Sequence, residues 1–158
     1  MIPADALAIG IGAFLGAVSR YQAGRMAAEW IATDPNKLNK LAGWHTAGIN
    51  IGGSFLLGGI AGSPIVNKTP VPRPAPTTVA SKRMFADFQG LTPRIKLLLG
   101  VGFCGSYTTF STYSVDVATW LSQGNTSKAL SYMAVNNVGG VLAAGAGMVL
   151  SKKFFGYR

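Results

Sequence analysis

The 158-residue sequence is short of charge, and above all of acidic charge. Charged residues make up 12% of the chain, about half the share usual in soluble domains, and only 5 residues are Asp or Glu. A soluble protein with so few charges could not cover its surface, so the composition favours a membrane protein. The 21 glycines agree, since transmembrane helices pack through small side chains.

Other absences exclude several classes of protein. The single cysteine excludes an intrachain disulfide and any cysteine spacing typical of a metal site. No glycine-lysine phosphate-binding motif occurs, so a nucleotide-driven pump is not expected. Cys104, His45 and the serines form no nucleophile–base set, so no enzyme is predicted. The N-terminus lacks the positively charged leader of a secretory signal, and the first apolar run is interpreted as a retained helix.

The net charge of +9 does not indicate nucleic-acid binding. The basic residues are dispersed along the chain instead of forming a stripe, and most of them flank apolar runs. We interpret them as determinants of membrane topology and as contacts to lipid headgroups.

Four apolar segments predict an all-α membrane protein with four transmembrane helices, at about residues 6–28, 44–60, 94–121 and 129–150. They form one membrane domain, residues 1–158, with both termini on the same side. Gly10, Gly12 and Gly16 are expected to admit a neighbouring helix closely. A proline-rich stretch at about residues 63–93 cannot be helical throughout and is predicted to be a solvent-exposed loop.

The third segment contains the most unusual stretch, Gly102–Ser114, which reads Gly-Phe-Cys-Gly-Ser-Tyr-Thr-Thr-Phe-Ser-Thr-Tyr-Ser. Its glycines and hydroxyls predict an interruption of the helix, from about Gly105 to Thr109. Irregular backbone at membrane depth is tolerated only where it is buried in protein or lines something polar. Phe110 and Tyr113 share a helical face. They either pack in the core or present positive ring edges to a small anion beside the hydroxyls, while freed carbonyls can bind a cation.

The other polar residues within the apolar segments leave alternatives open. Arg20 either lines a vestibule that attracts anions or extends its side chain to the membrane surface. Asn50 and Asn136 either bond to each other or line a path for a small anion. Asp116 is expected to pair with a basic residue near its helix end.

The stretch Gly102–Ser114 closely resembles the signature of the CrcB/Fluc family of fluoride channels. Supporting matches are Gly12–Tyr21 in the first segment and Thr46–Phe55 in the second. The resemblance implies a fluoride-selective channel in the plasma membrane that exports fluoride passively and confers fluoride resistance. It also implies an antiparallel, dual-topology homodimer with two pores, in contact with membrane lipid, and a structural sodium ion at the dimer centre.

The resemblance assigns roles to particular residues. It places Arg20 in the vestibule, and the sodium ion against the main-chain carbonyls of Gly105 and Thr108. The anion pathway that it implies consists of Thr46, Asn50, Thr109, Phe110, Ser111, Thr112, Tyr113, Tyr132 and Asn136.

Three residues depart from the family pattern. Tyr113 replaces the usual second phenylalanine and adds a hydroxyl to the pathway. Asn136 stands where many members have serine, and Asp116 replaces the usual glutamate.

Dual topology and channel function each have competing hypotheses. Basic residues are more numerous on the side of the termini than on the other side, which favours termini in the cytoplasm. A fixed orientation and a heterodimer with an oppositely inserted partner therefore stay open. A proton-coupled small multidrug transporter would need a carboxylate deep in a helix, which the first segment lacks. A non-conducting membrane scaffold, with polar residues acting only between helices, is the other alternative.

Overall fold

The computed structural model describes residues 2–38, 41–66 and 90–155. Most of the proline-rich segment that is predicted as a loop lies outside these residues. Apart from one bridge between Ile65 and Leu91, the described residues form only helices and their connections. In chain order the elements are α1 (Pro3–Thr33), α2 (Pro35–Leu38), α3 (Trp44–Gly62), α4 (Pro93–Lys96), the π-helix η2 (Leu97–Cys104), α5 (Gly105–Tyr107), α6 (Phe110–Ser122) and α7 (Thr126–Phe154).

The long helices contain the predicted apolar segments and extend beyond them. α1 has 31 residues and α7 has 29. At about 1.5 Å per residue each is roughly 45 Å long, more than the ~30 Å hydrocarbon core of a bilayer. Judged by length and apolar composition alone, one described helix, α7, could cross a membrane. The third predicted segment is divided into shorter elements.

Local sequence explains where some helices begin and what stabilises the end of another. Pro3 and Pro93 occupy the first turn of α1 and α4, where a missing amide hydrogen costs nothing. The Thr92 hydroxyl accepts a hydrogen bond from the Ile95 amide and so caps α4. Lys152 and Lys153 lie in the last turn of α7, where a positive charge complements the helix dipole.

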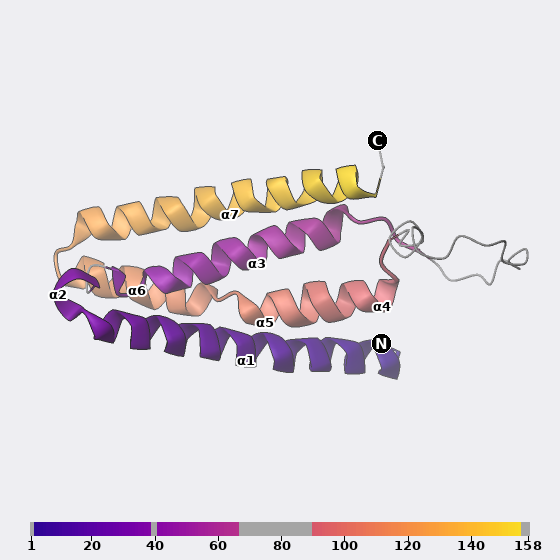
Figure 1. Cartoon of the computed structure of the whole chain (residues 1–158), viewed down its shortest axis with the longest axis horizontal. Helices are drawn as coiled ribbons and strands as arrows, with labels where there is room; N and C mark the ends of the chain where they lie inside the picture. Colours follow the sequence, from indigo (N-terminus) through magenta and orange to yellow (C-terminus); the bar gives the residue numbers. More distant parts are fainter. Residues whose placement is uncertain (1, 39–40, 67–89, 156–158) are drawn as a thin grey trace, which may run out of the picture.

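The elements form a bundle in which η2 and α5, the first part of the divided third segment, lie between α1 and α3 (Figure 1). α7 runs along α3, while α1 runs along η2 and α5. α6 contacts α7. The beginning of α1 and the end of α7 lie at the same end of the bundle, as the sequence predicts.

Two helix pairs approach so closely that backbone meets backbone. A Cβ atom on Gly12 of α1 would lie 1.9 Å from the Leu98 carbonyl oxygen of η2. One on Gly147 of α7 would lie 2.2 Å from the Phe55 carbonyl oxygen of α3. Gly16 is buried in the first of these contacts, but nothing lies within 4 Å of a Cβ on Gly10. The expectation for the first segment therefore holds for two of its three glycines.

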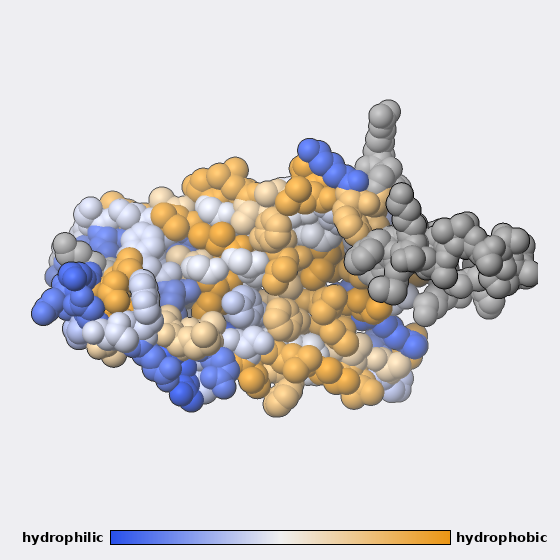
Figure 2. Space-filling model, viewed as in Figure 1, coloured by the Kyte–Doolittle hydropathy of each residue, from blue (hydrophilic) through white to orange (hydrophobic). Residues whose placement is uncertain are grey.

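Apolar side chains cover much of the outside of the bundle. Figure 2 shows them over the half nearer the end of α7, whereas hydrophilic residues gather at the end where α2 lies. Phe14 and Val141, for example, are 69% and 73% exposed. Apolar surface of this extent requires lipid or another protein as its cover.

Candidate functional site

The third segment is interrupted at Thr108 and Thr109. α5 ends at Tyr107, and both threonines have extended backbone, with ψ of 157° and 112°. α6 then begins at Phe110. The predicted interruption is present, although Gly105 itself is still helical.

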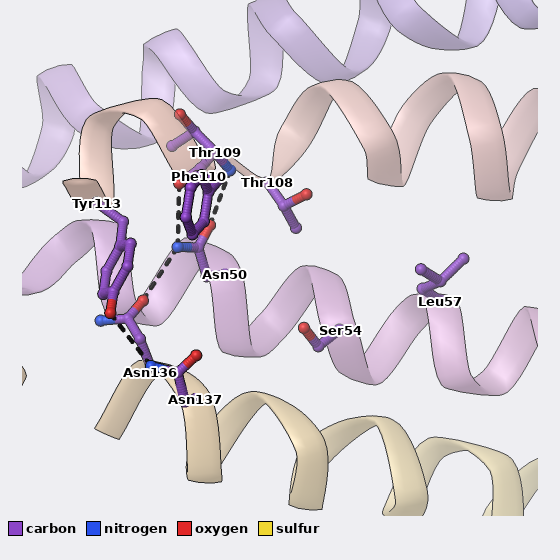
Figure 3. A pocket seen from close by; sticks show the side chains of 9 residues that line it. All are labelled: Asn50, Ser54, Leu57, Thr108, Thr109, Phe110, Tyr113, Asn136 and Asn137. Atoms are coloured by element: carbon purple, nitrogen blue, oxygen red, sulfur yellow. Dashed lines mark hydrogen bonds between the residues drawn. The ribbon is translucent and has the colours of Figure 1, made fainter. Parts of the chain in front are cut away.

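Asn50 of α3 holds the interrupted backbone. Its Oδ1 accepts from the Thr109 amide at 2.8 Å, and its Nδ2 donates to the Thr109 carbonyl at 3.3 Å. The same Nδ2 donates to Asn136 Oδ1 at 3.0 Å (Figure 3). The Thr109 amide can only donate, which fixes the orientation of the Asn50 side chain. Both amide hydrogens of Asn50 are therefore engaged within the protein.

Asn136 of α7 bonds both to its own helix and to Asn50. Its Nδ2 donates to the Tyr132 carbonyl at 3.0 Å, and its Oδ1 accepts from Asn50. The two asparagines do bond to each other, as one of the alternatives from the sequence proposes.

Three hydroxyls meet at the beginning of α6. Thr109 Oγ1 accepts from the Thr112 amide at 3.2 Å and so caps the helix. It also donates to Thr112 Oγ1 at 3.0 Å and lies 3.2 Å from Ser111 Oγ. The first turn of a helix favours negative charge, because its amides and its dipole point toward it. The cluster therefore suits an anion.

The interruption also removes the helical partners of several carbonyl groups, among them those of Gly105 and Thr108. In a continuous helix the Thr109 amide would bond to the Gly105 carbonyl, and the Thr112 amide to the Thr108 carbonyl. They donate instead to Asn50 Oδ1 and Thr109 Oγ1. Arg20 Nη1 of α1 lies 3.4 Å from the Thr108 carbonyl oxygen, a long hydrogen bond. Carbonyl oxygens suit a hard cation such as sodium, and of these carbonyls Arg20 reaches that of Thr108.

A cavity of about 220 Å³ opens beside the interruption. Side chains from α3, the interruption, α6 and α7 surround it (Figure 3). None of its lining residues is charged, and they are Asn50, Ser54, Leu57, Thr108, Thr109, Phe110, Tyr113, Asn136 and Asn137.

Two aromatic rings form one wall of this cavity. Phe110 and Tyr113 have ring centroids 5.6 Å apart, and Tyr113 stacks on Tyr132 at 5.5 Å. Tyr113 is 9% exposed and belongs to the buried core, whereas Phe110 is 79% exposed. Both rings line the cavity, with Tyr113 largely buried and Phe110 at the open edge, so the structure does not choose between core packing and contact with an anion.

The structure separates the other predicted residues from the cavity. Thr46 and Tyr132 are buried, at 1% and 0% exposure, and do not line it. The Tyr132 hydroxyl donates to Asp116 Oδ2 at 2.9 Å. No described basic side chain pairs with Asp116, in contrast to the expectation from the sequence. Predicted residues that do not line the cavity are Arg20, Thr46, Gly105, Ser111, Thr112 and Tyr132.

Sequence reasoning missed three residues that line the cavity. Ser54 lies one helical turn after Asn50 and Leu57 lies two turns after it, so both follow from helical spacing once Asn50 is placed. Asn137 follows Asn136 in an uncharged segment, where a second amide needs a partner. This need for a hydrogen-bond partner was the signal in the sequence that could have pointed to Asn137.

Comparison with known proteins agrees with the resemblance. A family model described as "CrcB-like protein, Camphor Resistance (CrcB)" matches residues 7–148. The "Fluoride-specific ion channel FluC" of Gloeobacter violaceus is 26% identical over 148 residues, or 94% of this chain and 96% of that protein. The protein of the same name from Koribacter versatilis is 32% identical over 141 residues, 87% of this chain and 90% of its own. "Fluoride-specific ion channel FluC 2" of Bacillus thuringiensis subsp. konkukian is 32% identical over 146 residues, 92% and 96%.

A helical bundle with an apolar exterior and an uncharged polar cavity at an interrupted helix defines a helical membrane protein. The chain belongs to the CrcB family, whose model covers nearly its whole length.

Proposed function

We propose that the protein is a fluoride-selective channel that lets fluoride leave the cell down its electrochemical gradient and so confers fluoride resistance. The observation that carries this proposal is the cavity at the interruption, which combines amide and hydroxyl groups with aromatic rings and has no charged lining residue. Its relatives bear the name fluoride-specific ion channel. Conduction of this kind needs no catalytic group.

Fluoride is small and strongly hydrated, so its path must replace water at each step. Hydroxyl and amide donors supply that replacement, and the positive edge of an aromatic ring adds to it. Phe110 presents its ring at the open edge of the cavity, and the Asn136 amide lines the same cavity. Asn50 acts by holding the interruption in place, with Thr46 and Tyr132 packed behind the path. Ser111 and Thr112 provide hydroxyls at its outer end, and Arg20 attracts the anion toward it.

A second copy of the chain completes the pathway. The 79% exposure of Phe110 and the open cavity beside it support this arrangement, because an anion there would meet lipid on the other side. The proposed assembly is an antiparallel dual-topology homodimer of four-helix subunits, spanning the plasma membrane several times. Accessibility labelling of both termini in membranes would find each terminus on both sides. One orientation without a partner chain would contradict dual topology, and one orientation with a partner would indicate a heterodimer.

A sodium ion at the dimer centre would be held by the carbonyls of Gly105 and Thr108, which have lost their helical amides. It would supply fixed positive charge between the two copies. Arg20 shares the Thr108 carbonyl, which has a second lone pair for the ion. Replacing sodium by a bulky organic cation should weaken the dimer during gel filtration. Unchanged association would contradict the site.

Fluoride efflux from reconstituted liposomes tests the function. We expect rapid fluoride efflux with little chloride efflux, and strong loss of fluoride efflux in Phe110→Ile with the dimer intact. A dimer of Phe110→Ile that conducts at the wild-type rate would contradict the ring-edge role.

The same liposomes separate the competing functions. No fluoride efflux from a well-folded protein would favour the scaffold, and proton-coupled export of drugs would favour the transporter. The transporter is disfavoured because no carboxylate lines the cavity and Asp116 is bonded to Tyr132.

A further inference from the structure

Asn137 lines the cavity but has no assigned role in the anion path. Its Nδ2 donates to the Met133 carbonyl at 2.8 Å and to the Tyr113 hydroxyl oxygen at 3.2 Å. The Met133 carbonyl can only accept, so the orientation of the Asn137 amide is fixed. Both hydrogens of Nδ2 are in use. Asn137 therefore cannot donate to an ion itself, and its effect must pass through Tyr113.

The Tyr113 hydroxyl is held in one orientation. Its ring is stacked on Tyr132 and lies against Phe110, so the oxygen has a fixed position. A phenol hydrogen prefers the ring plane and has two positions there. Asn137 donates to the Tyr113 oxygen on the side of one of these positions, so the hydroxyl hydrogen takes the position on the opposite side. None of the described residues accepts this hydrogen, and Tyr113 lines the cavity.

We propose that Asn137 is a positioning residue that turns the Tyr113 hydroxyl hydrogen into the cavity, where it donates to fluoride and favours fluoride over chloride. This inference rests on the proposed channel function. Fluoride is the strongest hydrogen-bond acceptor among the halides and gains most from a fixed donor. The pair of Tyr113 and Asn137, which are joined by a hydrogen bond (Figure 3), thus supplies a contact that a second phenylalanine could not make.

The test compares Asn137→Leu, Tyr113→Phe and the double variant in liposome efflux of fluoride and chloride. Each single variant should lower fluoride efflux about three- to tenfold, the range implied by one hydrogen bond. Each should lower the fluoride-to-chloride ratio too. The double variant should match Tyr113→Phe, because Asn137 acts only through the hydroxyl.

Ser131→Ala is the matched control, since Ser131 is an exposed polar residue of α7 that also bonds to a carbonyl one turn earlier. It should conduct like the wild type.

Three results would overturn the inference. They are a wild-type ratio in Asn137→Leu, losses that multiply in the double variant, or unchanged flux and ratio in Tyr113→Phe. The last result decides the matter if Asn137→Leu fails to elute as a folded dimer. A wild-type protein that passes no fluoride overturns the channel function and this inference together, whereas a conducting wild type with unaffected variants overturns the inference alone.

Discussion

The glycine contacts between helices and the interruption of the third segment solve opposite problems. At Gly147 the backbone of α7 meets the backbone of α3 because no side chain intervenes. At Thr108 and Thr109 the backbone leaves the helix, and the side chain of Asn50 accepts from the Thr109 amide, which has no helical partner, and donates to the Thr109 carbonyl. The close contact between helices depends on glycines, which have no side chain, whereas the interruption depends on the polar side chain of Asn50.

α3 takes part in both regions, which couples them. Phe55 of α3 lies against Gly147, while Asn50 lies about one and a half turns earlier on the same helix and faces the interruption. Close contact between α3 and α7 therefore sets the position from which Asn50 reaches Thr109 and Asn136. Tight packing in one region makes hydrogen bonding in the other possible.

The largest expected effect comes from adding a methyl group at the close contact. Gly147→Ala places a Cβ 2.2 Å from the Phe55 carbonyl oxygen, and the two helices must separate. We expect a loss of about 3 kcal/mol or more of stability, since neither backbone can yield easily. Thermal unfolding in detergent, followed by gel filtration, measures it.

Gly145→Ala is the matched control for this change, because a Cβ there meets nothing within 4 Å. It should leave stability unchanged or raise it by up to about 1 kcal/mol through helix propensity. Equal stability of Gly147→Ala and Gly145→Ala would show that the close contact between α3 and α7 does not require glycine at residue 147.

A smaller effect on stability is expected from Asn50→Leu, which removes the side chain that bonds to the interrupted backbone. The buried Thr109 amide then loses its acceptor, at a cost of about 1–3 kcal/mol, and the geometry of the cavity is lost. Folded protein should remain, with strongly reduced fluoride efflux. Asn125→Leu, an exposed asparagine outside the cavity, serves as the control. A conducting Asn50→Leu would show that the interruption holds without it.

The smallest effect is expected at the cap of α6. Thr109→Val keeps the shape of the side chain but removes the oxygen that accepts from the Thr112 amide, at a cost of about 1 kcal/mol. Thr109→Ser retains that oxygen and should restore stability in thermal unfolding. If Val and Ser behave alike, the cap contributes nothing measurable and Asn50 alone maintains the interruption.

Much of this arrangement could be predicted from residue types and their order. The interruption follows from glycines and hydroxyls in an apolar run, and the shared face of Phe110 and Tyr113 follows from helical spacing. That Asn50 and Asn136 need polar partners follows from the cost of burying an amide. Each of these predictions depends only on neighbours along the chain or on the apolar surroundings of a single residue.

Partners across the bundle could not be predicted in this way. Asp116 was expected to meet a basic residue and instead accepts from Tyr132, and Arg20 reaches the carbonyl of Thr108, 88 residues away. Both depend on how helices turn about their axes and how closely they approach, which many distant contacts set together.

Composition and residue order were thus enough for a helical membrane protein with an interrupted third segment and polar residues that require partners. The folded chain was needed to show that both amide hydrogens of Asn50 are engaged, that Asn136 bonds to Asn50, and that Asn137 bonds to Tyr113. The physical reason is that a residue's need for a hydrogen bond is a property of its chemistry, whereas the group that meets the need is chosen by the packing of helices.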